Sequence, residues 1–588
     1  MSEQATRRAL LKGSALALVA GLAGRAGAAE SPAKQSTQKV IPPQSSVLEV
    51  DIAAAERVLG LSFTATERAQ LARGYDQVLG QLGTVRKLDI ANDVTPATRF
   101  DPRLPGKKYA APAARVRGKA PAAGPLPSAA DDIALAPVWK LAQWLRTKAI
   151  SSTDLTSLYL DRIARLAPRL ENFITVTGDL ALAQAKEADL GLGRGRVLSP
   201  LHGVPYGLKD LFDVAGVRST WGAEPYANRP PAQQDAAITA KLRAAGAVLL
   251  GKTAVGALAY GDIWQDGRAR NPWNPQEGSS GSSAGSASAA AAGLIGFGIG
   301  TETVGSIISP SHRCGVAGLR PTFGRVSRHG GMALAWSWDK VGTLARSVAD
   351  CGLILSVING GDTRDWGWID MPFGFSWQTR VAHLRVGYVP AFFEGVGSID
   401  VDRGALAAVR ELGAKLVEIS FPNLPIASLN QLALLEAAAA FSELTLSNRD
   451  DMLSWQDDSA WPNSWRRARL FPAVEMVQLE RLRRLTMVAF DELFSSIDVL
   501  IGPNYQGGAL VATNATGHPS LALRAGFIEA PTRGLRDDPL DPLGPRFRVP
   551  RAVSLWAPLF REDALITLGR ALEERLGVAD DHPPIARS

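Results

Sequence analysis

A serine-rich stretch in the middle of the chain, EGSSGSSAGSASAAAAG at residues 277–293, offers many hydroxyl groups that could act as nucleophiles. A serine hydroxyl becomes a good nucleophile only when a neighbouring base takes its proton. Residues 281–285 match G-x-S-x-G, a sharp turn that must follow an apolar strand. The preceding GRARNPWNPQE has two prolines and no such strand, so we attribute the match to chance. The stretch is then either a flexible linker or a loop that lies close to a substrate.

Four segments around this stretch, in a fixed order, carry a more specific pattern. They are LHGVPYGLKDLFDVAG (201–216), GSSGSSAGSASAAAAG (278–293), GIGTETVGSIISPSHRCGVAGLRPTFGRVSRHG (298–330) and SWDKVGTLARSVAD (337–350). Together they resemble the amidase signature family, whose members carry an HGVPxxxKD stretch, a GGSSGGS loop and a GTDTGGSIRxPA loop. The resemblance continues through NATGHPSLAL (514–523) and spans about residues 136–577.

The resemblance implies both a fold and a set of reacting groups. The fold is α/β, with a central mixed, mostly parallel β-sheet covered by helices on both faces. The reacting groups are a Ser–cis-Ser–Lys triad, which by position consists of the base Lys209, the relay Ser282 and the nucleophile Ser306. The peptide bond between Gly281 and Ser282 is expected to be cis. On this interpretation residues 277–293 are a catalytic loop and not a linker.

Lys209 can act as a base only in its neutral form, so its pKa must lie well below the usual ~10.4. Burial lowers a lysine pKa because desolvation penalises the ammonium ion. The surrounding run GVPYGLKDLFDV is largely apolar, which favours burial. Asp210 would oppose this effect if it faced the amine, and we expect it to point elsewhere. Lys252, in LLGKT, is a rival for the base, although the family does not use that position.

The resemblance also implies oxyanion and substrate-binding groups at Thr303, Val304, Gly305 and Ser283. Backbone N–H groups of residues 303–306 would stabilise the oxyanion, and losing one such donor typically costs ~3–4 kcal/mol. Val304 replaces a glycine of the family pattern, and a β-branched residue does not easily take a positive φ. If the loop requires a positive φ there, the oxyanion hole is distorted. The other departures from the pattern are Ser280, Ala284 and Glu302.

The predicted function is hydrolysis of a linear carboxylic amide C–N bond through a serine acyl-enzyme. Some family members place an Arg just beyond the nucleophile to bind a carboxylate, whereas this chain has Ile307, Ile308 and Ser309. An apolar, aryl or peptide amide is therefore the expected substrate. Two alternatives remain open: a catalytically inactive binding protein with the amidase fold and a glutamine-hydrolysing amidotransferase subunit. Residues 425–475 carry Trp455, Trp461 and Trp465, which fit either a substrate pocket or ordinary packing.

The elements that must position these groups alternate between helix and strand patterns, which is typical of an α/β domain. Residues 46–88 show helical periodicity, and residues 94–130 are rich in Pro and Ala and predict an extended, irregular segment. Ser151 and Asp154 form a capping-box-like helix start, and LRVGYVP, residues 401–414 and AKLVEISFP predict a β-α-β unit. The predicted domains are a signal segment (1–29), an N-terminal spacer (30–130) and the amidase signature domain (131–580).

The bulk composition excludes several classes of function. The 588 residues are 46% hydrophobic and 21% charged with a net charge of +7, and no block of like charge suggests nucleic-acid binding. The N-terminal TRRALLKGSALALVAGLAGRAGAAE resembles a twin-arginine export signal, which predicts a periplasmic protein without a stable membrane anchor after its removal. Cys314 and Cys351 are expected to be buried free thiols. No metal, cofactor or nucleic-acid partner is indicated; the expected partner is a small-molecule amide substrate, and a monomer or homodimer is expected.

Overall fold

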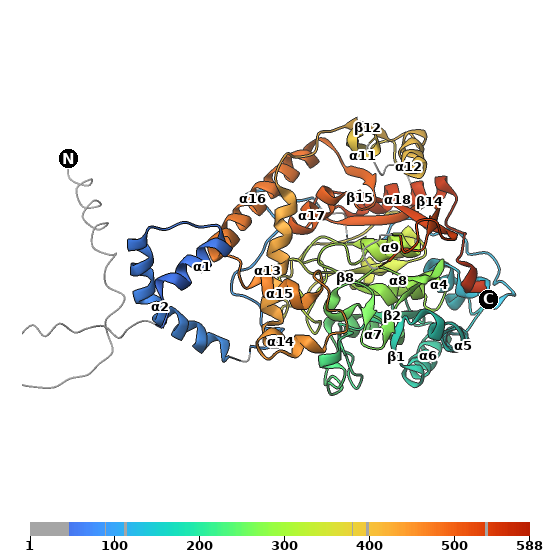
Figure 1. The fold of residues 1–588 in the computed structure, drawn as a ribbon. Helices are drawn as coiled ribbons and strands as arrows, with labels where there is room; N and C mark the ends of the chain where they lie inside the picture. Colours follow the sequence, from blue (N-terminus) through green and yellow to red (C-terminus); the bar gives the residue numbers. More distant parts are fainter. Residues whose placement is uncertain are drawn as a thin grey trace, which may run out of the picture. The chain divides into compact units, whose positions relative to one another are not determined.

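The computed structural model describes residues 46–88, 90–110, 114–378, 380–394, 399–534 and 539–587. The predicted export segment therefore lies outside the described residues. The chain divides into two compact units, one comprising residues up to Arg57 with Leu61–Thr84, and one comprising Val58–Gly60 with the residues from Val85 onward. Most of α1 (Glu49–Leu59) and α2 (Ala65–Arg86) belongs to the first unit, as the helical periodicity predicted (Figure 1).

The second unit is built around a sheet of eleven described strands in the order β1-β3-β2-β8-β10-β9-β14-β15-β13-β11-β12. The strands are β1 (Phe173–Val176), β2 (Pro205–Lys209), β3 (Val248–Thr253), β8 (Phe297–Glu302), β9 (Ala317–Arg320), β10 (Lys340–Ala345), β11 (Arg385–Tyr388), β12 (Lys415–Glu418), β13 (Val499–Pro503), β14 (Ser520–Pro531) and β15 (Arg546–Trp556). Two short hairpins, β4 (Ile263–Trp264) with β5 (Gly267–Arg268) and β6 (Arg270–Asn271) with β7 (Asn274–Gly278), lie outside this sheet.

The sheet is mixed, so the predicted α/β class with a central mixed sheet is confirmed. Parallel neighbours occur towards its two ends, where β3, β2 and β8 run together and β13, β11 and β12 run together. The neighbours from β8 through β10, β9, β14 and β15 to β13 are all antiparallel. The predicted β-α-β unit is present as β11, α12 and β12, with the two strands parallel.

Helices pack against this sheet (Figure 1). Helix α8 contacts α9, β8 and β2, whereas α10 contacts α18, α7 and β10. The helices of the second unit are α3 (Ala130–Ala134), α4 (Val138–Arg146), α5 (Ser152–Leu170), α6 (Gly178–Gly193), α7 (Ala237–Ala244), α8 (Ala284–Ala291), α9 (Ile308–Cys314), α10 (Val348–Ile358), α11 (Pro390–Glu394), α12 (Asp400–Glu411), α13 (Asn430–Ala440), α14 (Ser442–Leu446), α15 (Trp461–Ala468), α16 (Ala473–Ser496), α17 (Gly507–Ala515) and α18 (Glu562–Leu576).

Local sequence explains where two of these helices lie. Oγ of Ser151 accepts the N–H of Asp154 at 2.9 Å, so the predicted cap of α5 is confirmed. Every residue of α8 is buried, because its Gly, Ser and Ala side chains allow close packing against neighbouring backbone. A Cβ on Gly285 would collide with backbone atoms of Asn172 and Ala254. The small residues therefore form a buried helix and not a linker.

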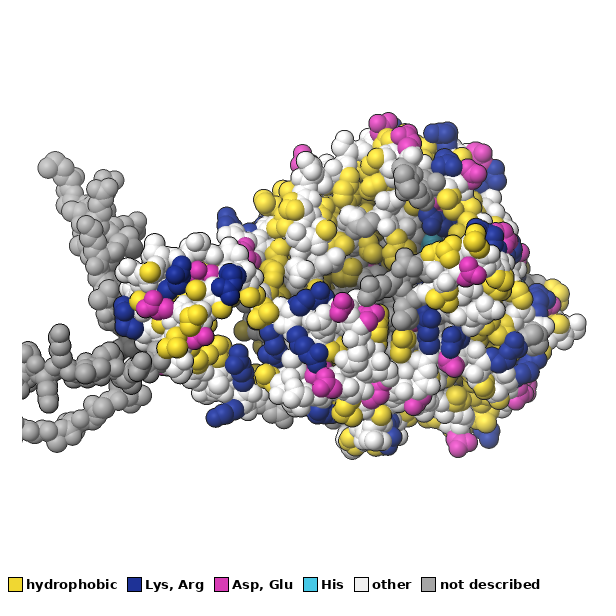
Figure 2. Space-filling view, in the orientation of Figure 1, with side chains coloured by type: hydrophobic (Ala, Val, Ile, Leu, Met, Phe, Trp, Pro, Cys, Tyr) yellow, Lys and Arg dark blue, Asp and Glu magenta, His cyan; other side chains and the backbone are white. Residues whose placement is uncertain are grey.

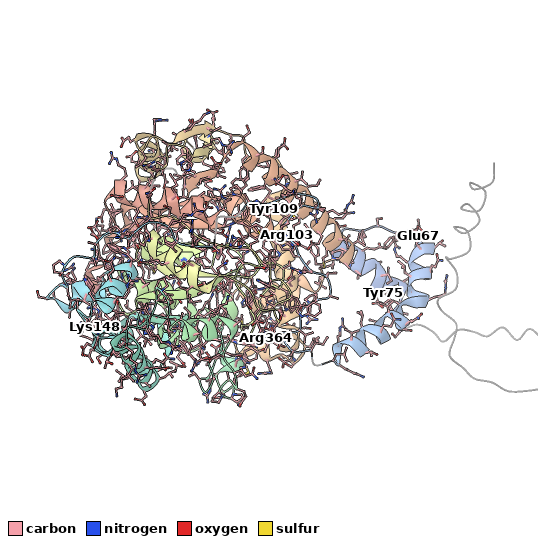
Figure 3. The ribbon with its side chains drawn as sticks, turned by 180° about the vertical axis from the view of Figure 1, so that it is seen from behind. Glu67, Tyr75, Arg103, Tyr109, Lys148 and Arg364 are labelled. Carbon is pink, nitrogen blue, oxygen red and sulfur yellow. The ribbon has the colours of Figure 1, made fainter. Side chains whose placement is uncertain are left out.

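The described part of residues 94–130 contains no helix before α3, as predicted, and side-chain contacts anchor it within the second unit. Nη2 of Arg99 donates to the carbonyl of Trp368 at 2.7 Å. The hydroxyl of Tyr109 accepts the N–H of Leu104 at 2.7 Å, and its ring packs edge-on against Phe560. Figure 3 shows Tyr109 close to Arg103 on this unit.

Hydrophobic side chains gather on the surface around α16 (Figure 2). The exposed members on this helix are Val474, Met476, Val477, Leu485 and Val488. None of the helices that the structure describes is long and apolar enough to cross a bilayer. Cys314 and Cys351 are both buried and free, which confirms that prediction.

Candidate active site

Lys209 is the last residue of β2, and its amine lies in the interior of the second unit. The residue is completely buried, with 0% of its surface exposed. Its Nζ lies 2.9 Å from Oγ of Ser282, 3.1 Å from Oγ of Ser283 and 2.8 Å from Oγ1 of Thr301. The predicted base is therefore in direct contact with the predicted relay serine.

The surroundings of this amine lower its pKa from 10.5 to about 7, because burial penalises the ammonium form. The carboxylates of Asp339 and Glu302 act in the opposite direction. Asp210 points away from the amine: its Oδ1 accepts from Nζ of Lys252 at 2.6 Å, and its Oδ2 accepts the N–H of Thr220 at 2.8 Å. The predicted orientation of Asp210 is confirmed, and the rival base Lys252 is held in a buried ion pair.

The paired serines lie where the small-residue stretch enters α8. The peptide bond between Gly281 and Ser282 is cis, as the resemblance implied. Oγ of Ser283 accepts the N–H of Thr301 at 3.2 Å and donates to the carbonyl of Thr301 at 3.0 Å. A Cβ on Gly281 would collide with the carbonyl oxygen of Gly261. Close packing of backbone on backbone explains why this position is a glycine.

Ser306 lies in the turn between β8 and α9. Its carbonyl accepts the N–H of Ser283 at 3.1 Å, which joins this turn to the serine loop. Ser306 is 8% exposed, whereas Ser282 is 1% exposed, so Ser306 is the more exposed of the two residues. The hydrogen bonds among the described residues include none between the hydroxyls of Ser306 and Ser282, so the relay contact stays a prediction.

The turn that contains Ser306 presents backbone donors without partners. Within the described ranges, the N–H groups of Val304, Gly305 and Ser306 donate to no protein acceptor. Buried backbone N–H groups are nearly always paired, so adjacent unpaired donors suit an anionic ligand atom. Gly305 takes a φ of +90°, and Val304 is not among the residues with positive φ. The distortion considered for Val304 therefore does not occur.

Side chains from β8 and its neighbours hold this turn in place. Oγ1 of Thr303 donates to Oδ1 of Asp339 at 2.6 Å. Oε2 of Glu302 accepts the N–H groups of residues 307–308 at 2.8 and 3.0 Å, and Nη1 of Arg320 donates to Oε1 at 2.6 Å. Burial alone would raise the pKa of Glu302, but Arg320 and the N–H donors hold it at about 2. Glu302 is therefore ionised, and its carboxylate holds the first turn of α9 in place.

Three contributors to this site were not predicted from the sequence. Thr301 contacts the Lys209 amine, Asp339 holds Thr303, and Ser280 takes a φ of +59° with its hydroxyl bonded to that of Ser309. Thr301 and Asp339 both lie inside the quoted motifs, GTETVGS and SWDKVG, which is the signal that could have found them. Ser280 occupies a position where the family pattern has glycine, and its positive φ explains that preference.

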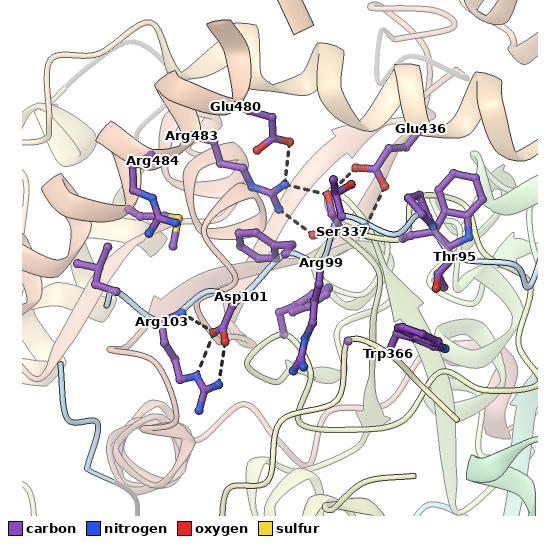
Figure 4. Close-up of a pocket in the computed structure, with 18 of the residues that line it drawn as sticks. Thr95, Arg99, Asp101, Arg103, Ser337, Trp366, Glu436, Glu480, Arg483 and Arg484 are labelled. Atoms are coloured by element: carbon purple, nitrogen blue, oxygen red, sulfur yellow. Dashed lines mark hydrogen bonds and ion pairs between the residues drawn. The ribbon is translucent and has the colours of Figure 1, made fainter. Parts of the chain in front are cut away.

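A cavity of about 820 Å³ lies elsewhere in the second unit, and none of the predicted triad residues lines it (Figure 4). Arg483 at its wall donates to Oγ and to the carbonyl oxygen of Ser337, and Ser337 in turn donates to Glu436. Arg103 pairs with Asp101. These charged groups satisfy one another, so we assign the cavity no reaction. No group of three or more His, Cys, Asp or Glu in the described ranges is arranged to hold a metal ion.

Comparison with known proteins agrees with this arrangement. Residues 154–565 match the family described as Amidase. The chain is 33% identical over 445 residues to a subunit of glutamyl-tRNA(Gln) amidotransferase from Marinomonas sp. (strain MWYL1), covering 67% of this chain and 91% of that protein.

Solved structures give the same result at the level of the fold. A native peptide amidase from Stenotrophomonas maltophilia has a TM-score of 0.64 at 27% identity, covering 76% of this chain and 98% of that one. A bacterial aryl acylamidase of the amidase signature family has a TM-score of 0.64 at 20% identity, covering 76% and 99%, which supports the fold alone. The matched residues include the Lys209, Ser282 and Ser306 segments, and the chain belongs to the amidase signature family.

Proposed function

We propose that this chain hydrolyses the C–N bond of a linear carboxylic amide through a serine acyl-enzyme. Nζ of Lys209 takes a proton from Ser282 as Ser282 takes one from Ser306, and Oγ of Ser306 attacks the amide carbon. The N–H groups of residues 304–306 stabilise the oxyanion. The relay then delivers its proton to the departing amine as the C–N bond breaks. Water, deprotonated by the same relay, attacks the acyl carbon. The relay returns this proton to Oγ of Ser306 as the ester bond breaks and the carboxylic acid leaves.

The observation that carries this proposal is the buried amine of Lys209 in contact with Oγ of Ser282. An amine with a pKa of about 7 is substantially neutral near neutral pH and can accept a proton there. The mechanism also needs hydrogen-bond donors already in place for the negative charge of the tetrahedral intermediate. The unpaired N–H groups beside Ser306 can supply them.

An apolar, aryl or peptide amide is the proposed substrate class. Ile307, Ile308 and Ser309 follow the nucleophile, so no cation stands there to bind a substrate carboxylate. Among the similar solved structures, one at 27% identity is a peptide amidase by name, and this name fits the proposed class.

The direct test is turnover of a neutral aryl amide such as 4-nitroacetanilide. Ser306→Ala and Lys209→Ala are each expected to lower kcat by at least about a thousandfold, because each removes one end of the relay. Lys186→Ala, at an exposed position on α6, is the matched control and should retain full activity. Full activity of either relay variant contradicts the mechanism. Failure of a fluorophosphonate probe to label the wild-type protein would instead favour the inactive binding protein.

A second candidate is the glutamine-hydrolysing subunit of an amidotransferase, which the names of the curated relatives favour. The two functions differ in substrate, so purified protein should be assayed with glutamine and with the aryl amide side by side. Glutaminase activity without aryl amidase activity supports the second candidate. We also propose export to the periplasm as a monomer or homodimer, which fractionation of a reporter fusion and sedimentation measurements test.

A further inference from the structure

An aromatic pocket lies directly behind the serine loop. It is lined by Glu224 of the short helix η1 (Glu224–Tyr226), by Tyr260 and by Trp264, Trp455 and Trp461. The rings of Tyr260 and Trp455 are stacked with centroids 4.9 Å apart, and Trp461 lies 4.8 Å from Tyr260. We call this the Glu224 pocket.

The Glu224 pocket contacts the proposed catalytic machinery through residues 260–262. A Cβ on Gly261 would lie 3.1 Å from the ring of Trp455, and the carbonyl oxygen of Gly261 blocks any side chain at Gly281. Oδ2 of Asp262 accepts the N–H of Ser280 at 2.9 Å. One short segment therefore has the pocket on one side and the serine loop on the other.

Only one of the two carboxylate oxygens of Glu224 has hydrogen-bond partners. Its Oε1 accepts the N–H of Ser454 at 3.1 Å and also bonds the Ser454 hydroxyl. Its Oε2 is buried and has no hydrogen-bond partner. Among the described residues no cation forms an ion pair with Glu224, since the nearby Arg449 pairs with Glu443 and donates to the carbonyl of Pro225.

A buried carboxylate oxygen without a partner is costly, and aromatic faces around it attract cations. The volume of the pocket is about 20 Å³, which is room for one group the size of a water molecule. A primary ammonium group fits that volume, whereas a guanidinium does not. The indole N–H of Trp455 is also buried and has no hydrogen-bond partner.

We propose that the Glu224 pocket is a specificity subsite that binds a primary ammonium group of the substrate. This inference rests on the proposed amide hydrolysis and narrows its substrate class to amides that carry an ammonium group. The ammonium donates to Oε2 of Glu224 and lies among the aromatic side chains that line the pocket.

The test measures binding to the Ser306→Ala protein by calorimetry, so that no turnover intervenes. Three probes share a six-carbon acyl chain: hexanamide, 2-aminohexanamide and 6-aminohexanamide. At least one ammonium amide is expected to bind about tenfold or more tightly than hexanamide, and the two amino amides distinguish an α-ammonium from a side-chain ammonium. Adding Glu224→Gln should abolish the preference, whereas Glu187→Gln, at an exposed position on α6, should preserve it.

Equal binding of the three amides, or a preference that survives Glu224→Gln, overturns the proposal. So does a crystal structure at saturating ammonium amide that shows only an ordered water between Glu224 and Trp455. Trp455→Leu serves as a second variant that keeps the carboxylate and should weaken the preference several-fold. Persistent hydrolysis by the Ser306→Ala protein would contradict the proposed function itself, which is a separate outcome.

Discussion

At the scale of single residues, Lys209 links burial to activity. Because burial lowers its pKa to about 7, the neutral base replaces the ammonium form as the pH rises through that value. We therefore expect kcat/KM for a neutral aryl amide to rise with pH through an apparent pKa near 7 and to level off above it. Rates measured from about pH 5 to 9 at constant ionic strength check this, and a flat profile contradicts it.

The same shift has a consequence for stability, with a definite sign. Between about pH 7 and 10.5 the unfolded chain carries a proton on Lys209 that the folded chain has lost. Stability attributable to this residue therefore rises with pH across that window. Urea unfolding at several pH values, compared with Lys209→Met, isolates the contribution, and a variant with the same pH dependence as the wild type would contradict it.

The buried pair of Asp210 and Lys252 gives a second prediction at this scale. Both side chains are completely buried and joined at 2.6 Å, so Lys252→Met leaves a carboxylate without its cation. We expect the free energy of unfolding to fall by roughly 3–5 kcal/mol. The double variant Asp210→Asn with Lys252→Met should lose clearly less. Urea unfolding measures both, with the exposed Lys186→Met as control, and equal losses in the single and double variants would contradict the argument.

At the scale of elements, the conformation of the turn from β8 into α9 is held by side-chain packing at Val304 and by the positive φ of Gly305. Val304 packs with Ile308, Leu510 and Ala522, while Gly305 takes the positive φ. Restoring the family's glycine with Val304→Gly is therefore expected to lower the free energy of unfolding by about 2 kcal/mol, through lost packing and added chain entropy, without raising kcat. Urea unfolding and turnover of the aryl amide check this. A several-fold gain in kcat would show that Val304 does distort the oxyanion hole.

How far the sequence predicts such elements depends on the range of the forces involved. The cap at Ser151 and the β11-α12-β12 unit follow from local patterns, and both were predicted. The contact between Lys209 and Thr301 joins residues 92 positions apart, and the side chain of Val304 packs against Leu510 and Ala522, which lie far along the chain. The antiparallel middle of the sheet was not predicted either, because strand order depends on contacts between residues far apart in the sequence.

At the scale of the whole molecule, the segment before α3 belongs with the second unit although it lies outside the matched Amidase residues. Asn92 accepts the N–H of Ala333 at 2.7 Å and donates to the carbonyl of Ala333 at 2.9 Å. The ring of Phe100 lies 3.6 Å from the guanidinium of Arg483, a cation–π contact. The loop of residues 333–339 ends at Asp339, whose Oδ1 accepts the hydroxyl of Thr303. This segment therefore supports the turn that contains Ser306 through one intermediate loop.

Two truncations separate the contributions of the units. A chain that begins at Val85 keeps nearly all of the second unit and should retain its unfolding midpoint and kcat/KM within about twofold, because a compact unit can fold on its own. A chain that begins at Ala129 loses Asn92 and Phe100, so its free energy of unfolding should fall by about 3 kcal/mol or more, with lower kcat. Urea unfolding and aryl amide turnover measure both. If the chain from Ala129 matched the chain from Val85 in stability and rate, the segment would have no part in supporting Asp339, and the loop of residues 333–339 would hold its position unaided.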